Sequence, residues 1–257
     1  MRPEIGLPPD VSSEGWRIDA LLHHTLIAVG VIALVATVWL LWALISSRRN
    51  KTPRYSHGVS RGAIAIPLSI AAVIFFAVDA RLFAISTSDL DVLTDVAAAE
   101  ADPNAVRIEI NAHQWAWDVR YAGIDGRFAT ADDVVVLDEL RIPRGAPIIV
   151  QLAAVDVIHS FSIPGLRIKQ DVVPGTLQTV WFEATATGQL EIACAQHCGV
   201  NHYKMRGVVT VMPPAAFSAW QEQASRDAER TRAVFRKAIA DGAKARAVLD
   251  WGWAWQP

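Results

Sequence analysis

The feature that most constrains this 257-residue chain is a run of 21 residues without an ionisable side chain, from Leu26 to Ser46. As an α-helix, with a rise of about 1.5 Å per residue, this run would reach roughly 31 Å, the thickness of the hydrocarbon core of a bilayer. A second uncharged run, Gly62 to Val78, can continue if Asp79 and Arg81 lie near the membrane interface or face protein. The sequence therefore predicts a two-helix transmembrane hairpin, at about 25–46 and 62–85.

The loop between the two runs indicates which way the hairpin crosses. It reads SSRRNKTPRYSHGVSR, with basic residues and no acidic one, and positively charged loops stay on the cytoplasmic side. The acidic first 20 residues and everything after about residue 86 are then expected outside. We therefore expect a multi-pass protein of the bacterial inner (plasma) membrane, in contact with membrane lipid, with both termini on the periplasmic side.

Short alternating or β-branched runs separated by turn residues replace the helical pattern after a polar linker. Seven such runs indicate a β-sandwich or barrel. They are 106–110, 115–121, 134–140, 147–152, 179–183, 189–193 and 207–211. After Pro213 and Pro214, an alanine-rich charged run is typical of a surface helix. The expected organisation is an outer N-terminal segment 1–20, a transmembrane hairpin 21–86, a linker 87–104, an all-β domain 105–214 and a C-terminal helical extension 215–257.

The net charge of −2 is unevenly distributed along the chain. Residues 87–214 carry 16 acidic and 9 basic side chains, a net charge of −7, whereas the C-terminal extension has a net charge of only +2. An acidic outer domain favours a basic partner protein by electrostatic steering. The weak charge of the extension argues against nucleic acid as a partner.

The strongest chemical signal is a cluster of soft metal ligands late in the predicted β-domain. Cys194, Cys198, His202 and Met205 form the pattern C-x3-C-x3-H-x2-M, and His159 lies at the end of an earlier strand. Thiolates, a thioether and imidazoles favour copper over cations that prefer oxygen ligands. A blue copper site uses one cysteine, so two thiolates favour a pair of bridged copper ions.

Spacing alone leaves three other interpretations open. The two cysteines and two histidines could hold a structural zinc ion, which leaves Met205 unexplained. A Cys194–Cys198 disulfide, or a reactive dithiol, suits an oxidising compartment but leaves both histidines and the methionine unexplained. The third interpretation is coincidence.

The same residues carry a resemblance to a known family. CAQHCGVNHYKM resembles the binuclear copper A loop of cytochrome c oxidase subunit II, and DVIHSFSIPGLRIKQDVVPG resembles the segment with that family's upstream ligand. HQWAWDVRY, residues 113–121, resembles the family's aromatic segment. The resemblance covers residues from about 20 to 214. It implies that the outer domain is a cupredoxin-like Greek-key sandwich.

The resemblance also implies a complete ligand set, with two bridging thiolates and, on each copper ion, one imidazole and one weaker donor. The bridging residues would be Cys194 and Cys198. The other donors would be His159 with Met205 on one ion, and His202 with the backbone carbonyl of Gln196 on the other.

The function implied is that of the electron-transfer subunit of a respiratory haem-copper oxidase. Copper A would accept electrons from a c-type cytochrome, entering at Trp115, and pass them to haem in a catalytic subunit that reduces oxygen to water. Haem and other metals would belong to that and other oxidase subunits. Asp156 and Asp171 match positions near the site, where we expect them to dock the donor or support the ligands.

Two alternatives fit the same fold. The chain could be the copper A subunit of another terminal reductase, of the nitric oxide reductase type, or a metal-free structural subunit of a quinol oxidase. Loss of the ligands would mark the second, and all five ligand side chains are present.

The chain also departs from the family pattern. Gln196 stands where many members have glutamate, which puts a magnesium contribution in doubt, and Arg61 to Ile64 offers no glutamate at the start of the second helix. His197 is not a ligand in the family pattern.

Overall fold

The computed structural model describes residues 6–48, 55 and 57–240. The chain divides into two compact units, one made of Trp16–Leu93 and the other of Met1–Gly15 together with Thr94–Pro257. The first unit holds the two apolar runs, and the second holds the metal-ligand pattern. Part of the predicted inner loop, residues 49–54, and the chain after Ala240 lie outside the described residues.

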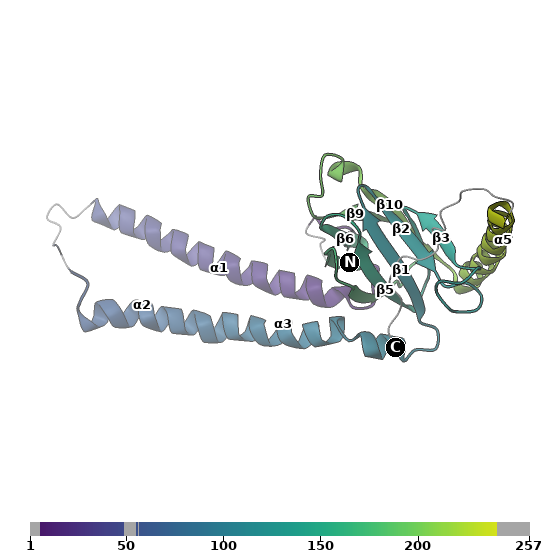
Figure 1. Cartoon of the computed structure of the whole chain (residues 1–257). Coiled ribbons are helices and arrows are strands. Elements are labelled where there is room, and N and C mark those ends of the chain that lie inside the picture. The colour runs from purple at the N-terminus through teal and green to yellow at the C-terminus, as the bar shows by residue number, and fades with distance from the viewer. Residues whose placement is uncertain (1–5, 49–54, 56, 241–257) are drawn as a thin grey trace. The chain divides into compact units, whose positions relative to one another are not determined.

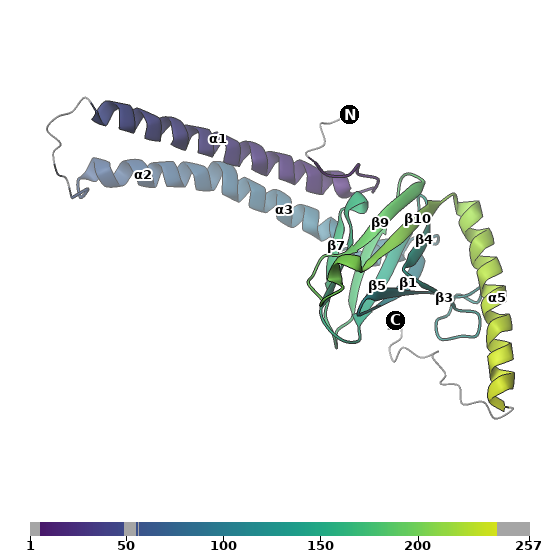
Figure 2. The same cartoon turned by 90° about the horizontal axis from the view of Figure 1, so that it is seen from above.

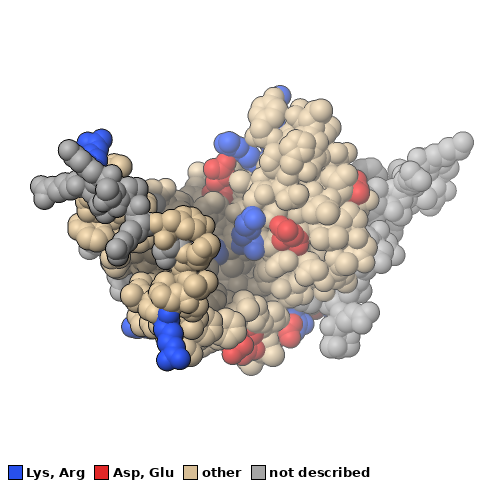
Figure 3. All heavy atoms as spheres, turned by 90° about the vertical axis from the view of Figure 1, so that its left-hand side faces the viewer, with Lys and Arg blue, Asp and Glu red and all other residues tan. Residues whose placement is uncertain are grey.

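Two long apolar helical segments form the first unit, as the sequence predicts (Figure 1). α1 spans Gly15–Ser47, and α2, Arg61–Ile74, continues through a π-helical turn, Phe75–Asp79, into α3, Ala80–Leu93. Both segments are long and apolar enough to cross a membrane, and their large apolar side chains are exposed. Apolar surface of this extent is expected to contact lipid or another protein. Basic side chains are visible at the loop end of the hairpin, nearest the viewer in Figure 3.

Helical structure extends further than the sequence predicts. α1 begins at Gly15, well before residue 25, and α3 continues into the expected linker, where a short helix α4, Val96–Glu100, follows. Thr87 lies in this continuation, and its Oγ1 donates to the carbonyl of Phe83 at 3.0 Å. Asp95 then caps the start of α4.

Among the described residues of the second unit, ten strands in two five-stranded sheets form a sandwich, which confirms the predicted all-β domain. One sheet has the order β3-β2-β1-β5-β8, and the other has the order β4-β10-β9-β6-β7. The strands are β1 Val106–His113, β2 Ala116–Tyr121, β3 Val134–Leu137, β4 Glu139–Pro143, β5 Pro147–Ala154, β6 His159–Ile163, β7 Ile168–Val172, β8 Gln178–Glu183, β9 Gly188–Cys194 and β10 Arg206–Met212.

Side chains from both sheets make the core of the sandwich. Trp117, Tyr121 and Phe161 are its largest fully buried apolar side chains, and the rings of Trp117 and Phe161 meet edge to face with their centroids 5.5 Å apart. Aliphatic residues at alternate positions, such as Ile108 and Ile110 of β1, fill the rest. This closely packed core therefore supports the strands that carry the metal-ligand pattern.

The predicted C-terminal helix is present as α5, Pro214–Ala240, which runs beside the sandwich next to β3 (Figures 1 and 2). Phe217 is buried against the core, and the ring of Trp220 lies 5.0 Å from that of Tyr121. Arg141 also stacks on Trp220, with its guanidinium carbon 5.0 Å from the ring centroid. Aromatic contacts thus attach the start of α5 to the sandwich.

Residues 10–13, which we call the N-terminal strap, pair with the sandwich ahead of α1. Ser12 forms a β-bridge with Ala184, and the carbonyl of Val11 accepts a hydrogen bond from the backbone N–H of Thr185 at 2.7 Å. The sequence predicts only an outer segment here, so this attachment is a finding of the structure.

Two strands depart from the predicted pattern. The run 134–140 is expected to be one strand, but Asp138 adopts a left-handed conformation with φ of 56° and divides it into β3 and β4, one in each sheet. β7 lies where the pattern predicts no strand, and it pairs with β6. The second difference matters for the site because β7 pairs with β6, and β6 begins with His159.

Candidate metal centre

Neighbouring strands of the second sheet bring the predicted ligands together. His159 is the first residue of β6, and Cys194 is the last residue of β9. The loop from β9 to β10 carries Cys198 and His202, and Met205 directly precedes β10. Because β9 lies between β6 and β10, ligands far apart in the sequence meet at one end of this sheet.

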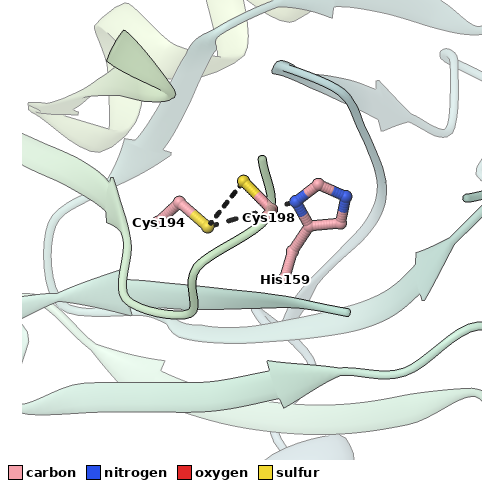
Figure 4. Close-up of side chains that lie close together, drawn as sticks. All are labelled: His159, Cys194 and Cys198. Carbon is pink, nitrogen blue, oxygen red and sulfur yellow. Dashed lines mark hydrogen bonds between the residues drawn. The ribbon is translucent and has the colours of Figure 1, made fainter. Parts of the chain in front are cut away.

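The two cysteine sulfurs form the middle of the cluster. They lie 3.8 Å apart, and both cysteines are free thiols. Cys194 Sγ is 4.0 Å from His159 Nδ1 and 3.2 Å from the carbonyl oxygen of Gln196. Figure 4 shows His159 and both cysteines pointing toward one another. The disulfide alternative therefore finds no support among the described residues.

The second sulfur has two donors of its own. Cys198 Sγ lies 3.5 Å from His202 Nδ1 and 3.7 Å from Met205 Sδ. His159, Cys198 and Met205 are almost completely buried, whereas His202 is partly exposed. The cluster is thus closed on the side of the core and reaches the surface at His202.

The chemistry of the donor set fits a pair of copper ions. Two thiols, two imidazoles, one thioether and one carbonyl exceed the four ligands that a structural zinc ion takes, and the sulfur donors favour copper. Two ions that share both thiolates, with four ligands each, need four further donors. The remaining groups of the cluster number four.

The two thiols ionise differently. Burial raises the pKa of the Cys194 thiol, but hydrogen bonds with His159 and with the backbone at Ser160 and Gln196 outweigh burial and lower it to about 6. Burial and the neighbouring Cys194 raise the pKa of the Cys198 thiol to about 12. The pair therefore loses its first proton more readily than an isolated thiol does, and thiolate is the form that binds metal.

Asp156 supports the buried imidazole. Its Oδ1 lies 2.9 Å from His159 Nε2, so the ring can present Nδ1 to the sulfurs. Burial raises the pKa of Asp156, but hydrogen bonds from His159 and from the backbone of Val157 and Gln114 outweigh burial and hold it below its ordinary value. Asp156 is thus an ionised support for His159.

Trp115 lies against the ligand loop, just ahead of β2. Its Nε1 donates to the carbonyl oxygen of Cys198 at 3.3 Å, and the side chain is partly exposed. The indole therefore contacts both the surface and the residue that carries one of the two sulfurs.

Two residues stay outside the ligand cluster. Asp171 is an exposed residue of β7, opposite Ser160 in the strand pair, and among the described residues no ligand contacts its carboxylate. His197 is exposed, with its ring 5.5 Å from that of His202. The structure thus supports a contact between Asp156 and the ligands but brings Asp171 to none of them.

Sequence reasoning missed one residue of the site. The side chain of Gln114 donates from Nε2 to the carbonyl of Cys198 at 2.8 Å. A glutamine beside an aromatic residue carries no recognisable metal or redox signature, so its only signal was its place next to Trp115.

The chain is similar to known proteins over this unit and beyond it. The family model described as "Cytochrome C oxidase subunit II, periplasmic domain" matches residues 125–212, which include all five ligand side chains. The alternative cytochrome c oxidase subunit 2 of Bradyrhizobium diazoefficiens is 36% identical over 142 residues, which are 47% of this chain and 51% of that protein. In that alignment the chain spans about half the length of its relative.

Two further matches extend the comparison. Cytochrome c oxidase subunit 2 of Cereibacter sphaeroides is 29% identical over 253 residues, covering 85% of this chain and 80% of that protein. The crystal structure of the periplasmic domain of subunit II of cytochrome oxidase of Bradyrhizobium japonicum is 26% identical, with a TM-score of 0.43, and covers 48% of this chain and 94% of that chain.

Proposed function

Because the chain belongs to the cytochrome c oxidase subunit II family, we propose that it is the electron-transfer subunit of a respiratory haem-copper oxidase. It would hold binuclear copper A, take electrons from a c-type cytochrome and deliver them to haem in a separate catalytic subunit that reduces oxygen to water. The observation that carries the proposal is the convergence of four further donor groups on two cysteine sulfurs 3.8 Å apart.

The ligand roles follow the resemblance. Cys194 and Cys198 would bridge the ions. His159 and Met205 would complete one ion, and His202 and the carbonyl of Gln196 the other. Such a pair, when bound, accepts and releases single electrons that are spread over both metals. The buried ligands and the Asp156 contact hold the donor atoms in place, so little needs to move when the charge changes.

The two units indicate the electron donor and the location in the membrane that we propose. Trp115 is the residue through which we expect electrons to enter, because its indole reaches from the surface to Cys198. The net charge of −7 over residues 87–214 favours a basic cytochrome. The apolar helices would lie in the bacterial inner membrane against the catalytic subunit, with the basic loop in the cytoplasm and the sandwich in the periplasm.

The test of the metal pair is spectroscopic. The full chain, purified in detergent and loaded with copper, should bind two copper ions, and its electron paramagnetic resonance spectrum should show one unpaired electron shared by two copper nuclei. Cys198→Ser should abolish this signal. Met205→Leu should alter the signal, whereas Met212→Leu, the matched change outside the cluster, should leave it intact. A chain that binds one zinc ion and yields no shared-electron signal would overturn the proposal.

The role of Trp115 needs a kinetic test. Trp115→Phe should keep the copper signal and slow reduction by reduced cytochrome c, because the indole that spans the gap to Cys198 is lost. Trp220→Phe changes a tryptophan of α5 and serves as the control. Equal reduction rates for Trp115→Phe and the wild type would reject this role.

A further inference from the structure

Two adjacent side chains converge on one oxygen atom beside the metal-binding cluster. Gln114 Nε2 donates to the carbonyl of Cys198 at 2.8 Å, and Trp115 Nε1 donates to the same carbonyl at 3.3 Å. A carbonyl oxygen has two lone pairs and can accept both hydrogen bonds. The tryptophan bond is long, whereas the glutamine bond has ordinary length. Gln114 is therefore the stronger attachment of this corner of the chain to Cys198.

The backbone of Gln114 is attached to the cluster as well. Its N–H donates to Asp156 Oδ2 at 2.7 Å, while Asp156 Oδ1 lies 2.9 Å from His159 Nε2. One residue is thus connected through its side chain to Cys198 and through its backbone, by way of Asp156, to His159. These contacts cross 84 and 42 positions of sequence, so they join separate loops of the sandwich.

The close approach depends on a glycine. Gly199, directly after Cys198, has φ of +124°, a conformation that residues with a side chain rarely adopt. A Cβ atom at this position would lie 2.9 Å from Gln114 Nε2 and 3.2 Å from Trp115 Cζ2. The Gln114–Trp115 corner therefore sits directly on the backbone of the Cys198–Gly199 turn.

We propose that Gln114 is a positioning residue for electron transfer, which holds the indole of Trp115 against the carbonyl of Cys198. The inference rests on the proposed function and adds a residue to it. In the step concerned, one electron passes from the haem iron of the reduced cytochrome, which is oxidised, to the copper pair, which is reduced. No bond forms or breaks and no proton moves. The rate of electron transfer therefore depends on how closely the indole of Trp115 contacts the carbonyl of Cys198.

The test replaces the glutamine with a residue of similar length that cannot donate. Gln114→Met in the copper-loaded full chain should slow reduction by a saturating concentration of reduced cytochrome c roughly 10-fold, within the range that coupled neighbours show. The shared-electron copper signal, the reduction potential and the rate with a small diffusible reductant should stay as in the wild type. Gln189→Met, at an exposed glutamine of β9, is the matched control.

A double variant distinguishes positioning from a direct role in docking. If Gln114 acts through the indole, Gln114→Met combined with Trp115→Phe should be no slower than Trp115→Phe alone. The proposal is overturned if Gln114→Met reduces at the wild-type rate, if it slows both reductants equally, or if its effect multiplies with that of Trp115→Phe. A wild-type chain without the shared-electron signal instead defeats the proposed function. If the wild-type chain shows that signal, cytochrome c reduces Trp115→Phe slowly and it reduces Gln114→Met at the wild-type rate, only this inference is defeated.

Discussion

At the scale of single residues, the two carboxylate oxygens of Asp156 contact different groups. Oδ1 contacts the His159 ring, and Oδ2 accepts the backbone N–H of Gln114. An asparagine has the same shape but only one accepting oxygen and no charge. The Asp156 side chain can therefore be tested without removing any ligand.

We expect Asp156→Asn to lower the affinity for copper about 10-fold or more, which is the usual cost of losing a group that orients a histidine ligand. A competition titration against a copper chelator measures it. Asp171→Asn makes the same chemical change at an exposed residue of β7 and should bind copper like the wild type. Equal affinities for Asp156→Asn and the wild type would contradict the supporting role.

A second carboxylate, Glu109, is buried far from any metal ligand in the sequence. It faces Arg120 across β1 and β2, and both side chains are inaccessible or nearly so. Glu109 Oε2 is bonded to Arg120, but Oε1 has no partner among the described residues. Burial raises the pKa of Glu109 to about 7, although the charge and hydrogen bond of Arg120 oppose the rise.

This raised pKa predicts a pH dependence of stability. Between the ordinary pKa of 4.5 and about 7, the folded chain keeps a proton that the unfolded chain has lost. The free energy of unfolding should therefore fall as pH rises through this window, by about 3 kcal/mol in total. Thermal unfolding should show this loss in the wild type and in Glu191→Gln, an exposed control, but a smaller one in Glu109→Gln. Parallel pH profiles for all three chains would be the contrary result.

At the scale of elements, the ligand loop was predictable because it is local. Four of the proposed ligand side chains fall within Cys194 to Met205, so their spacing is visible in the sequence. The contact of His159 with them depends on the pairing of β6 with β9, which joins segments about 35 positions apart. His159 could be counted with the loop by its residue type, and the family resemblance assigned it a ligand role, but no local pattern reports such strand pairing.

Other elements were hidden for physical reasons of their own. The run 134–140 was expected to be one strand, and its division depends on the left-handed Asp138, whose side chain accepts a hydrogen bond from the backbone of Trp117 at 2.8 Å. The extra turns of α3 consist largely of polar residues, from Ser86 to Asp91. Hydrophobic periodicity therefore marks neither the end of α3 nor the contact of Asp138.

The N-terminal strap offers a test at this scale. Ser12 Oγ accepts the N–H of Gly15 at 2.8 Å and donates to Asp10 at 2.7 Å, so it caps the start of α1. Ser12→Ala should lower the free energy of unfolding by about 1 kcal/mol, the usual cost of a lost cap. Thermal unfolding of the full chain measures it, with an unchanged copper signal. Ser13→Ala, where the backbone forms the contact, is the control, and an equal loss in both variants would contradict the cap.

At the scale of the whole molecule, the charges of the chain are divided by segment. Residues 87–214 have a net charge of −7, while the loop between the helical segments is basic. Asp156, which contacts His159, and Asp118, which pairs with His113, are both partly exposed. A field of one sign over the surface that meets the donor accelerates association with a partner of the opposite sign.

We therefore expect the association rate with a basic cytochrome c to fall steeply as salt is added, since charges beyond about 10 Å are screened at 0.1 M ionic strength. Stopped-flow mixing at a series of salt concentrations measures this rate. An uncharged small reductant should show no such dependence. A salt-independent rate with cytochrome c would mean that apolar contact, not charge, brings the donor to the sandwich.

The strap also has a consequence for the order in which the molecule is completed. The carbonyl of Val11 accepts hydrogen bonds from both the backbone and the hydroxyl of Thr185, 174 positions later. Both helical segments and eight of the ten strands precede Thr185 in the chain, so a ribosome must make all of them before this bridge can close. Joining such distant segments is slow because a long loop must close first. A segment that is synthesised before both helical segments thus reaches its final place only after most of the sandwich has been made.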